Sequence, residues 1–97
     1  MEGYNGWKNY PTWCVKLWID NDQGTQEYWM EAAVEAAELD GPVYVLERQL
    51  ETYFQDEGFP EQLYGTMNSD LLTWALGQVD WREIAASLIE DAKELTT

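Results

Sequence analysis

The feature that most constrains the fold is a single apolar face running along the end of the chain. Its residues recur at steps of three and four: Trp81, Ile84, Ala85, Leu88, Ile89, Ala92 and Leu95. This is the period of an α-helix that buries one side. Asp80 and Glu83 have the three-residue spacing of a capping box in which Asp replaces Ser or Thr. The sequence therefore predicts a helix that starts at Asp80 and packs against the rest of the protein.

The first helix is predicted near the start of the chain. Asn9 is a good N-cap, and Pro11 falls in the first turn, where its missing N–H costs little. Gly24 is expected to end this helix as a left-handed C-cap. Since both of its faces carry apolar residues, we expect this helix to be central and well buried.

Three further helices are predicted between the first and the last. Thr25 is expected to cap an Ala-rich helix that continues to Leu39. Pro42 is expected to begin the next, with an apolar stripe of Val43, Leu46, Leu50, Tyr53 and Phe54 and a stop at 58–60. After a loop, Asn68 or Ser69 is expected to cap a short helix closed by Gly77.

These elements indicate one all-α fold. A chain of 97 residues is about the size of one small domain, and no segment shows the alternation of a strand. Six Trp, six Tyr and two Phe supply material for a core. We expect a compact single domain spanning 1–97, with about five short helices and an aromatic-rich core that includes Tyr4, Trp7, Tyr10, Trp13 and Trp18.

Charge sets the class of partner. The chain has 19 Asp and Glu against 5 Lys and Arg, a net charge of −14. Such a surface repels nucleic acid and anionic membranes and attracts basic proteins. With no His and a lone Cys14, His-based catalysis and ordinary zinc sites are excluded. No signal peptide or membrane span is apparent, so we expect a cytoplasmic protein. We expect no cofactor, no metal and no enzymatic activity.

The carboxylates of the predicted helices form stripes, and on the second of these helices no Lys or Arg lies among them. The candidate partner-binding residues are Glu27, Glu31, Glu35, Glu38, Glu47, Glu51, Asp56 and Glu57, and the last helix adds Glu83, Glu90, Asp91 and Glu94. Like charges four residues apart destabilise a helix by about 0.2–0.5 kcal/mol per pair. One carboxylate recurs about every 6 Å along a helix axis, so two adjacent stripes approach the charge density of a DNA strand, with one phosphate per ~3.4 Å.

Other interpretations of the acidic residues remain open. The stripes are also typical of a solvated surface that keeps a protein soluble, or of adaptation to high salt. Asp20, Asp22 and Glu31 partly match an EF-hand loop, but Gly24 and Thr25 occupy positions that need an oxygen ligand and a Gly. We therefore interpret this segment as a polar turn that ends a helix. A carboxylate pair for glycoside hydrolysis cannot be singled out among the 19 acids.

The N-terminal block resembles a known group of proteins. The run from Tyr4 to Trp13 (YNGWKNYPTW), followed by LWIDND over 17–22, resembles the opening of short acidic proteins carried by phages and plasmids. Most of these are uncharacterised, and some are encoded among anti-defence genes. The segment 79–85 (VDWREIA) resembles their C-terminal helix, whereas Pro11 replaces an acidic residue of the pattern. The resemblance implies a mobile-element origin and a host target in restriction or CRISPR machinery.

Two functional hypotheses follow. The first is a non-enzymatic anti-CRISPR or anti-restriction inhibitor, whose acidic surface imitates DNA and binds a basic nucleic-acid-binding protein of the host defence machinery. The second is a small helical adaptor that binds its partner through an aromatic surface. Salt separates the two, because a screened electrostatic contact weakens with ionic strength and an apolar one hardly responds. The sequence leaves the oligomeric state open.

Overall fold

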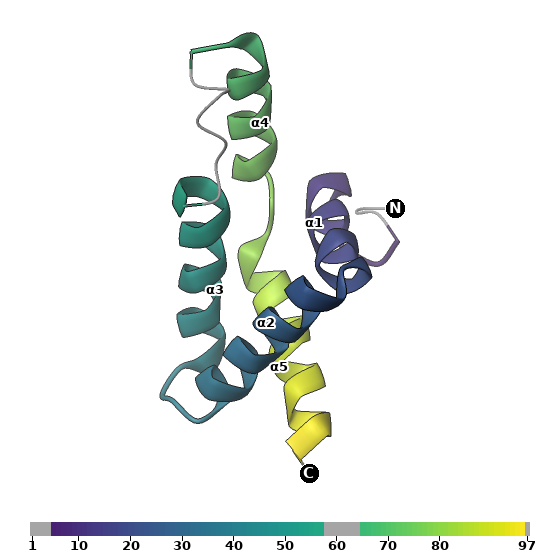
Figure 1. Cartoon of the computed structure of the whole chain (residues 1–97), viewed down its shortest axis with the longest axis vertical. Helices are drawn as coiled ribbons and strands as arrows, with labels where there is room; N and C mark the ends of the chain where they lie inside the picture. Colours follow the sequence, from purple (N-terminus) through teal and green to yellow (C-terminus); the bar gives the residue numbers. More distant parts are fainter. Residues whose placement is uncertain (1–4, 58–64, 97) are drawn as a thin grey trace.

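The computed structural model describes residues 5–57 and 65–96, and all regular elements in these ranges are helices (Figure 1). The α-helices are α1 (Tyr10–Asn21), α2 (Gln23–Ala37), α3 (Pro42–Thr52), α4 (Met67–Gly77) and α5 (Trp81–Thr96), and a π-helix, η1 (Tyr53–Glu57), continues α3. The predicted all-α fold with five helices is confirmed. No described helix is long and apolar enough to cross a bilayer.

The core lies where α2, α3 and α5 pack together. Its fully buried side chains include Ala33 from α2, Leu46 and Leu50 from α3, and Ile84 and Leu88 from α5. The apolar face predicted for the last helix is therefore confirmed wherever its side chains are described. Each of the three helices turns one side inward and leaves the other in solvent.

Aromatic rings fill one end of this core, as predicted. Phe54 stacks on Trp81, with ring centroids 5.5 Å apart, and also on Trp29, at 6.0 Å. Tyr53 meets the edge of Trp29 at 5.4 Å. The aromatic group therefore joins α2, η1 and α5. Of the N-terminal aromatic residues expected in the core, Trp7 packs partly buried against it, whereas Tyr10 and Trp18 are exposed.

Helix α1 is peripheral, which contradicts the expectation that it would be central. Its only buried residues are Thr12, Lys16 and Ile19, while Trp18 is 69 % and Tyr10 54 % exposed. A helix with two apolar faces is buried only where other elements cover both, and α1 lies at one edge of the bundle (Figure 1). Tyr4, also expected in the core, lies outside the described residues.

The boundary between α1 and α2 differs from the prediction. Helix α1 ends at Asn21, and Asp22 is the N-cap of α2, where its Oδ1 accepts a hydrogen bond of 2.9 Å from the backbone N–H of Thr25. Gly24 lies inside α2 and ends nothing. The side chain of Asp22 replaces the predicted cap at Thr25, because an Asp three residues ahead of a free N–H is the better acceptor. Helix α1 ends in this segment and residues 23–31 are helical, so they cannot wrap around an ion, in agreement with the interpretation as a polar turn and not an EF-hand loop.

The observed boundaries of α3 and α4 agree better with the predicted ones. Gly41 has a φ of +66°, a left-handed conformation that favours Gly, and α3 begins at Pro42 as predicted. Helix α4 ends at Gly77 as predicted, but its N-cap is Thr66, whose hydroxyl accepts from the backbone N–H of Ser69. The predicted cap at Asn68 or Ser69 was therefore two or three residues late. The predicted stop at 58–60 lies outside the described residues.

A polar junction fixes the start of α1 to the start of α5. Asp80 Oδ1 accepts from the N–H of Glu83 at 3.0 Å, which is the predicted half of the capping box. The other half is replaced by tertiary contacts. Glu83 Oε1 accepts from the N–H of Lys8 at 2.9 Å, and the N–H of Asp80 donates to Thr12 Oγ1 at 2.8 Å. The side-chain amide of Asn9, the N-cap of α1, donates to the carbonyl of Gln78 at 2.7 Å.

Helix α4 extends from the bundle at one end of the molecule's long axis (Figure 1). None of its residues is buried. Met67, Leu71 and Trp74, at four- and three-residue steps along one side, are 74 %, 59 % and 64 % exposed. The side chain of Gln55 in η1 donates a hydrogen bond of 3.3 Å to the carbonyl of Leu76, which holds the end of α4 near the core.

Candidate partner-binding surface

The outer face of α2 carries the acidic stripe predicted from the sequence. Its inner face is set by the buried side chains of Trp29, Ala33 and Ala36. The remaining side of the helix points to solvent and holds four exposed carboxylates: Glu27, Glu31, Glu35 and Glu38. The burial of one side of α2 therefore fixes the direction of the stripe on the other.

Arg48 of α3 lines the same groove as Glu31 and Glu35 of the α2 stripe but forms its ion pair with Glu51. Among the residues that the structure describes, none of the four carboxylates of the stripe forms an ion pair. Glu27 accepts a hydrogen bond of 3.1 Å from the side-chain amide of Gln23, which is neutral. Since repulsion between like charges at this spacing destabilises a helix, helix stability does not account for the arrangement.

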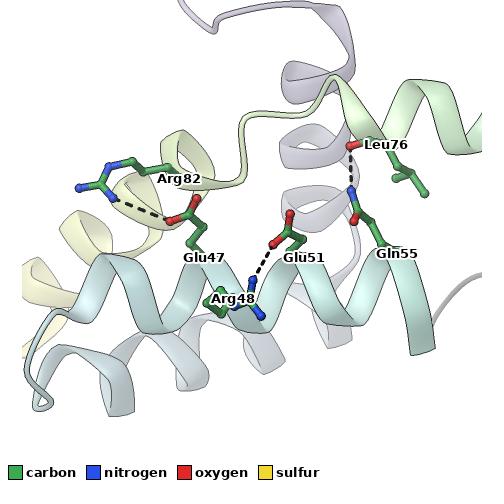
Figure 2. Close-up of polar contacts among 6 residues, drawn as sticks. All are labelled: Glu47, Arg48, Glu51, Gln55, Leu76 and Arg82. Atoms are coloured by element: carbon green, nitrogen blue, oxygen red, sulfur yellow. Dashed lines mark hydrogen bonds and ion pairs between the residues drawn. The ribbon is translucent and has the colours of Figure 1, made fainter.

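The carboxylates of α3 have a different environment (Figure 2). Glu47 Oε1 lies 3.8 Å from the guanidinium of Arg82 on α5, and Glu51 Oε1 lies 3.5 Å from that of Arg48. Both glutamates are half-buried. The two bases partly offset the charge of Glu47 and Glu51, and the assignment of these two residues to the partner-binding surface stays a prediction.

Two further predicted residues cannot be placed in the same way. Asp56 and Glu57 belong to η1, but their side chains lie outside the described part of the structure. They therefore stay predictions, and the surface is defined by the residues of α2 and its neighbours.

Helix α5 supplies the carboxylates that complete the acidic surface. A groove of about 460 Å³ between α2 and α5 is lined by Gln26, Glu27, Met30, Asp91 and Glu94. Three acidic side chains from two helices thus line one groove. We call Glu27, Glu31, Glu35, Glu38, Asp91 and Glu94 the acidic face. The acids of the last helix were noted in the sequence, but only the packing of α5 beside α2 joins them to the stripe.

The opposite edge of the acidic face borders a second groove, of about 660 Å³, between α2 and α3. Glu31 and Glu35 line one wall, and Arg48 lies among the residues of the other. Tyr28 and Tyr53 lie at this groove with ring centroids 6.1 Å apart. Arg48 therefore marks the boundary of the acidic face on the side of α3.

A metal site is not evident among the side chains that the structure describes. No group of three or more His, Cys, Asp or Glu side chains in 5–57 and 65–96 is arranged to hold a metal ion. The acidic face is an open surface with grooves on both sides of α2, and its negative charge attracts cations in general.

Comparison with known proteins identifies a family whose function is unknown. No curated protein and no solved structure matches the chain. A family of unknown function, DUF7249, matches residues 1–95, which is nearly the whole chain. The chain therefore belongs to the family of unknown function DUF7249.

Proposed function

We propose that the protein is a non-enzymatic inhibitor that binds a nucleic-acid-binding complex of the host defence machinery by imitating DNA. The acidic face would lie in the cationic groove of that complex and exclude the nucleic acid. The observation that supports this most is the α2 stripe, four exposed carboxylates that no described base neutralises. Charge of this density attracts a cleft built for phosphates.

The geometry of the acidic face suits this role. Along α2, consecutive stripe carboxylates are three or four residues apart, or about 5–6 Å along the axis. Asp91 and Glu94 of α5 place a second row across the groove from Glu27. Two rows of fixed charges are closer to a phosphate backbone than a single helix stripe. A rigid scaffold adds to affinity because little order has to be gained on binding.

The choice of target comes from the N-terminal block. Its resemblance to short acidic proteins of phages and plasmids supports a mobile-element origin, and hence a CRISPR or restriction complex as the target. The purified complexes of these two systems are the first to assay, since both hold DNA or RNA in basic grooves.

The double reversal Glu27→Lys/Glu31→Lys is expected to weaken inhibition by at least about tenfold, because exposed ion pairs contribute about 0.2–1 kcal/mol each and the new charges repel the target. The measurement is displacement of fluorescently labelled DNA from the purified complex, followed by anisotropy. Wild-type affinity should fall steeply as salt rises, since exposed charges are screened.

A matched control separates the surface from net charge. Asp40→Lys/Asp70→Lys makes the same change in charge at exposed positions off the acidic face and should inhibit within twofold of the wild type. Circular dichroism checks that both variants fold. Unchanged inhibition by a folded Glu27→Lys/Glu31→Lys variant would falsify the proposal. An equal loss of inhibition in both variants would show that inhibition depends on the net charge of the protein and not on the acidic face.

A second candidate function is an adaptor that binds through apolar contacts, and the exposed side of α4 favours it. An eleven-residue helix on its own is marginal in water. Leu76 of α4 packs partly buried against the core, but no residue of this helix is fully buried. Met67, Leu71 and Trp74 would pack against an apolar helix face of another protein.

The variant Leu71→Ser/Trp74→Ser separates the two functions. If the acidic face is the binding surface, this variant should displace labelled DNA within twofold of the wild type, because neither side chain belongs to that face. A loss of tenfold or more, together with weak dependence on salt, would favour the adaptor. The same titration used for the charge reversals gives both results.

A further inference from the structure

A third groove lies on the edge of the molecule, apart from the acidic face. Its volume is about 340 Å³, which is enough for one side chain and at the small end of ligand pockets. The residues that line it come from α1, the start of α2 and η1: Cys14, Val15, Trp18, Ile19, Asp22, Thr25, Tyr53 and Phe54. We call it the Trp18 groove.

The walls of the Trp18 groove are apolar and aromatic. Ile19 belongs to the core and Phe54 packs against it, so the positions of both side chains are set by the fold. Trp18, in contrast, is 69 % exposed although it lines a cavity. Most of the Trp18 side chain is therefore in contact with solvent, and part of it lines the groove. An exposed indole face attracts a cation, and tryptophan does so better than the other aromatic residues.

One carboxylate lies at the groove and is held in place. Asp22 Oδ1 accepts from the backbone N–H of Thr25 at 2.9 Å as the N-cap of α2. Hydrogen bonds from the backbone and the side chain of Thr25 lower the pKa of Asp22, so the carboxylate stays ionised. The groove therefore combines apolar walls, an open indole face and a fixed negative charge.

We infer that the Trp18 groove binds an arginine side chain of the basic partner. The aliphatic part of the arginine would lie against Val15 and Phe54, and the guanidinium would stack on Trp18 and pair with Asp22. The inference rests on the proposed function for the source of the arginine, because that function requires a cationic partner. A guanidinium suits the groove better than an ammonium, since it is planar, stacks on aromatic faces and is more weakly hydrated.

Charge selects this occupant over an apolar one. An apolar side chain in the groove would cover Asp22 and remove water from its carboxylate without replacing the lost hydrogen bonds, which is unfavourable. A guanidinium restores them as charge-assisted hydrogen bonds. A second copy of this chain is an unfavourable source, because each copy carries a net charge of −14.

The test titrates the whole protein with N-acetyl-arginine amide and, in parallel, with its neutral isostere N-acetyl-citrulline amide. The indole N–H resonance of Trp18, assigned with Trp18→Phe, is followed by ¹⁵N NMR at low salt. We expect a saturable shift with arginine and a dissociation constant on the order of 10–100 mM, as for one exposed cation–π contact together with one exposed ion pair. The resonance of Trp74, which is equally exposed on α4, should not follow.

The variant Asp22→Asn keeps the cap, because Asn caps a helix as well as Asp, but removes the charge. It should weaken arginine binding by about fivefold, the effect of one close charge pair in water. Asp40→Asn makes the same charge change outside the groove and should have no effect. Equal binding of citrulline and arginine, unchanged binding by Asp22→Asn, or parallel shifts at Trp74 would each overturn the inference.

This experiment fails separately from the proposed function. It uses a free amino-acid derivative and needs no target complex. Saturable arginine binding together with unimpaired inhibition by Glu27→Lys/Glu31→Lys would leave the groove standing and remove the DNA mimic. Loss of inhibition by that reversal, without arginine binding at Trp18, would support the DNA mimic and overturn the inference about the groove.

Discussion

Trp29→Ala is expected to lower the free energy of unfolding by about 3–5 kcal/mol, the usual effect of truncating a buried tryptophan. Trp29 is 2 % exposed and lies on the inner side of α2. Its ring contacts Tyr28, Tyr53 and Phe54, with centroids 5.0, 5.4 and 6.0 Å away. Since small domains have a total stability of about 5–15 kcal/mol, the variant should fold only marginally.

Urea denaturation followed by far-UV circular dichroism measures this loss without relying on tryptophan fluorescence. Trp29→Phe keeps an aromatic ring in the site and should recover part of the stability. Trp74→Ala removes an exposed indole from α4 and should change stability by no more than about 0.5 kcal/mol, as expected for a surface position. A loss below about 1 kcal/mol in Trp29→Ala would contradict the central place of this ring in the core.

The same residue links stability to the proposed function. Trp29 shares α2 with the stripe, and its burial keeps Glu27 and Glu31 on the outside. Like charges on that outer side oppose helix formation, so the inner side must supply the stabilisation. The acidic face is therefore expected to require an intact core, and the charge reversals need the check of folding that accompanies them.

Most of the helices could be predicted because they follow from local signals. The last helix is the clearest case, since its apolar period and the Asp80 cap agree with each other. Gly41 and Pro42 likewise mark a boundary that depends only on backbone conformation. Each of these signals lies within a short stretch of sequence, so the helix boundary that it predicts does not depend on contacts with distant parts of the chain.

The errors arose where several local signals competed or where tertiary contacts decide. Asp22, Gly24 and Thr25 each signal a helix boundary, and the fold uses only Asp22. The apolar faces of α1 suggested burial, but coverage depends on how many neighbours surround a helix. The other partners of Asp80 and Glu83 lie about seventy residues earlier in the chain, so no spacing could indicate them.

The candidate surface was partly predictable for the same reason. The stripe on α2 follows from helix periodicity, and its four carboxylates lie on one exposed side. Whether a second stripe joins it depends on helix packing. The fold sets Arg82 beside Glu47 and brings Asp91 to the groove beside Glu27. The fold therefore adds carboxylates of α5 to the α2 stripe, and the contribution of α3 stays a prediction.

Thr12→Val is expected to lower the free energy of unfolding by about 2–4 kcal/mol, although the two side chains have nearly the same shape. Thr12 is fully buried. Its hydroxyl accepts from the N–H of Asp80 at 2.8 Å and donates to Asn9 Oδ1 at 2.6 Å. Valine would leave the Asp80 N–H without this acceptor, and an unsatisfied buried donor costs about 1–3 kcal/mol in addition to the lost hydrogen bond to Asn9.

Thr12→Ser is the matched control, because it keeps the hydroxyl and loses one methyl group, worth about 0.8 kcal/mol. Urea denaturation compares the two variants, and amide hydrogen exchange provides a local readout. The Asp80 amide should exchange faster in Thr12→Val and remain protected in Thr12→Ser. A greater loss of stability in the serine variant would show that the methyl group, and not the hydroxyl, holds α1 to α5. The expected order follows from the junction itself, in which one buried hydroxyl connects the first turns of two helices distant in sequence.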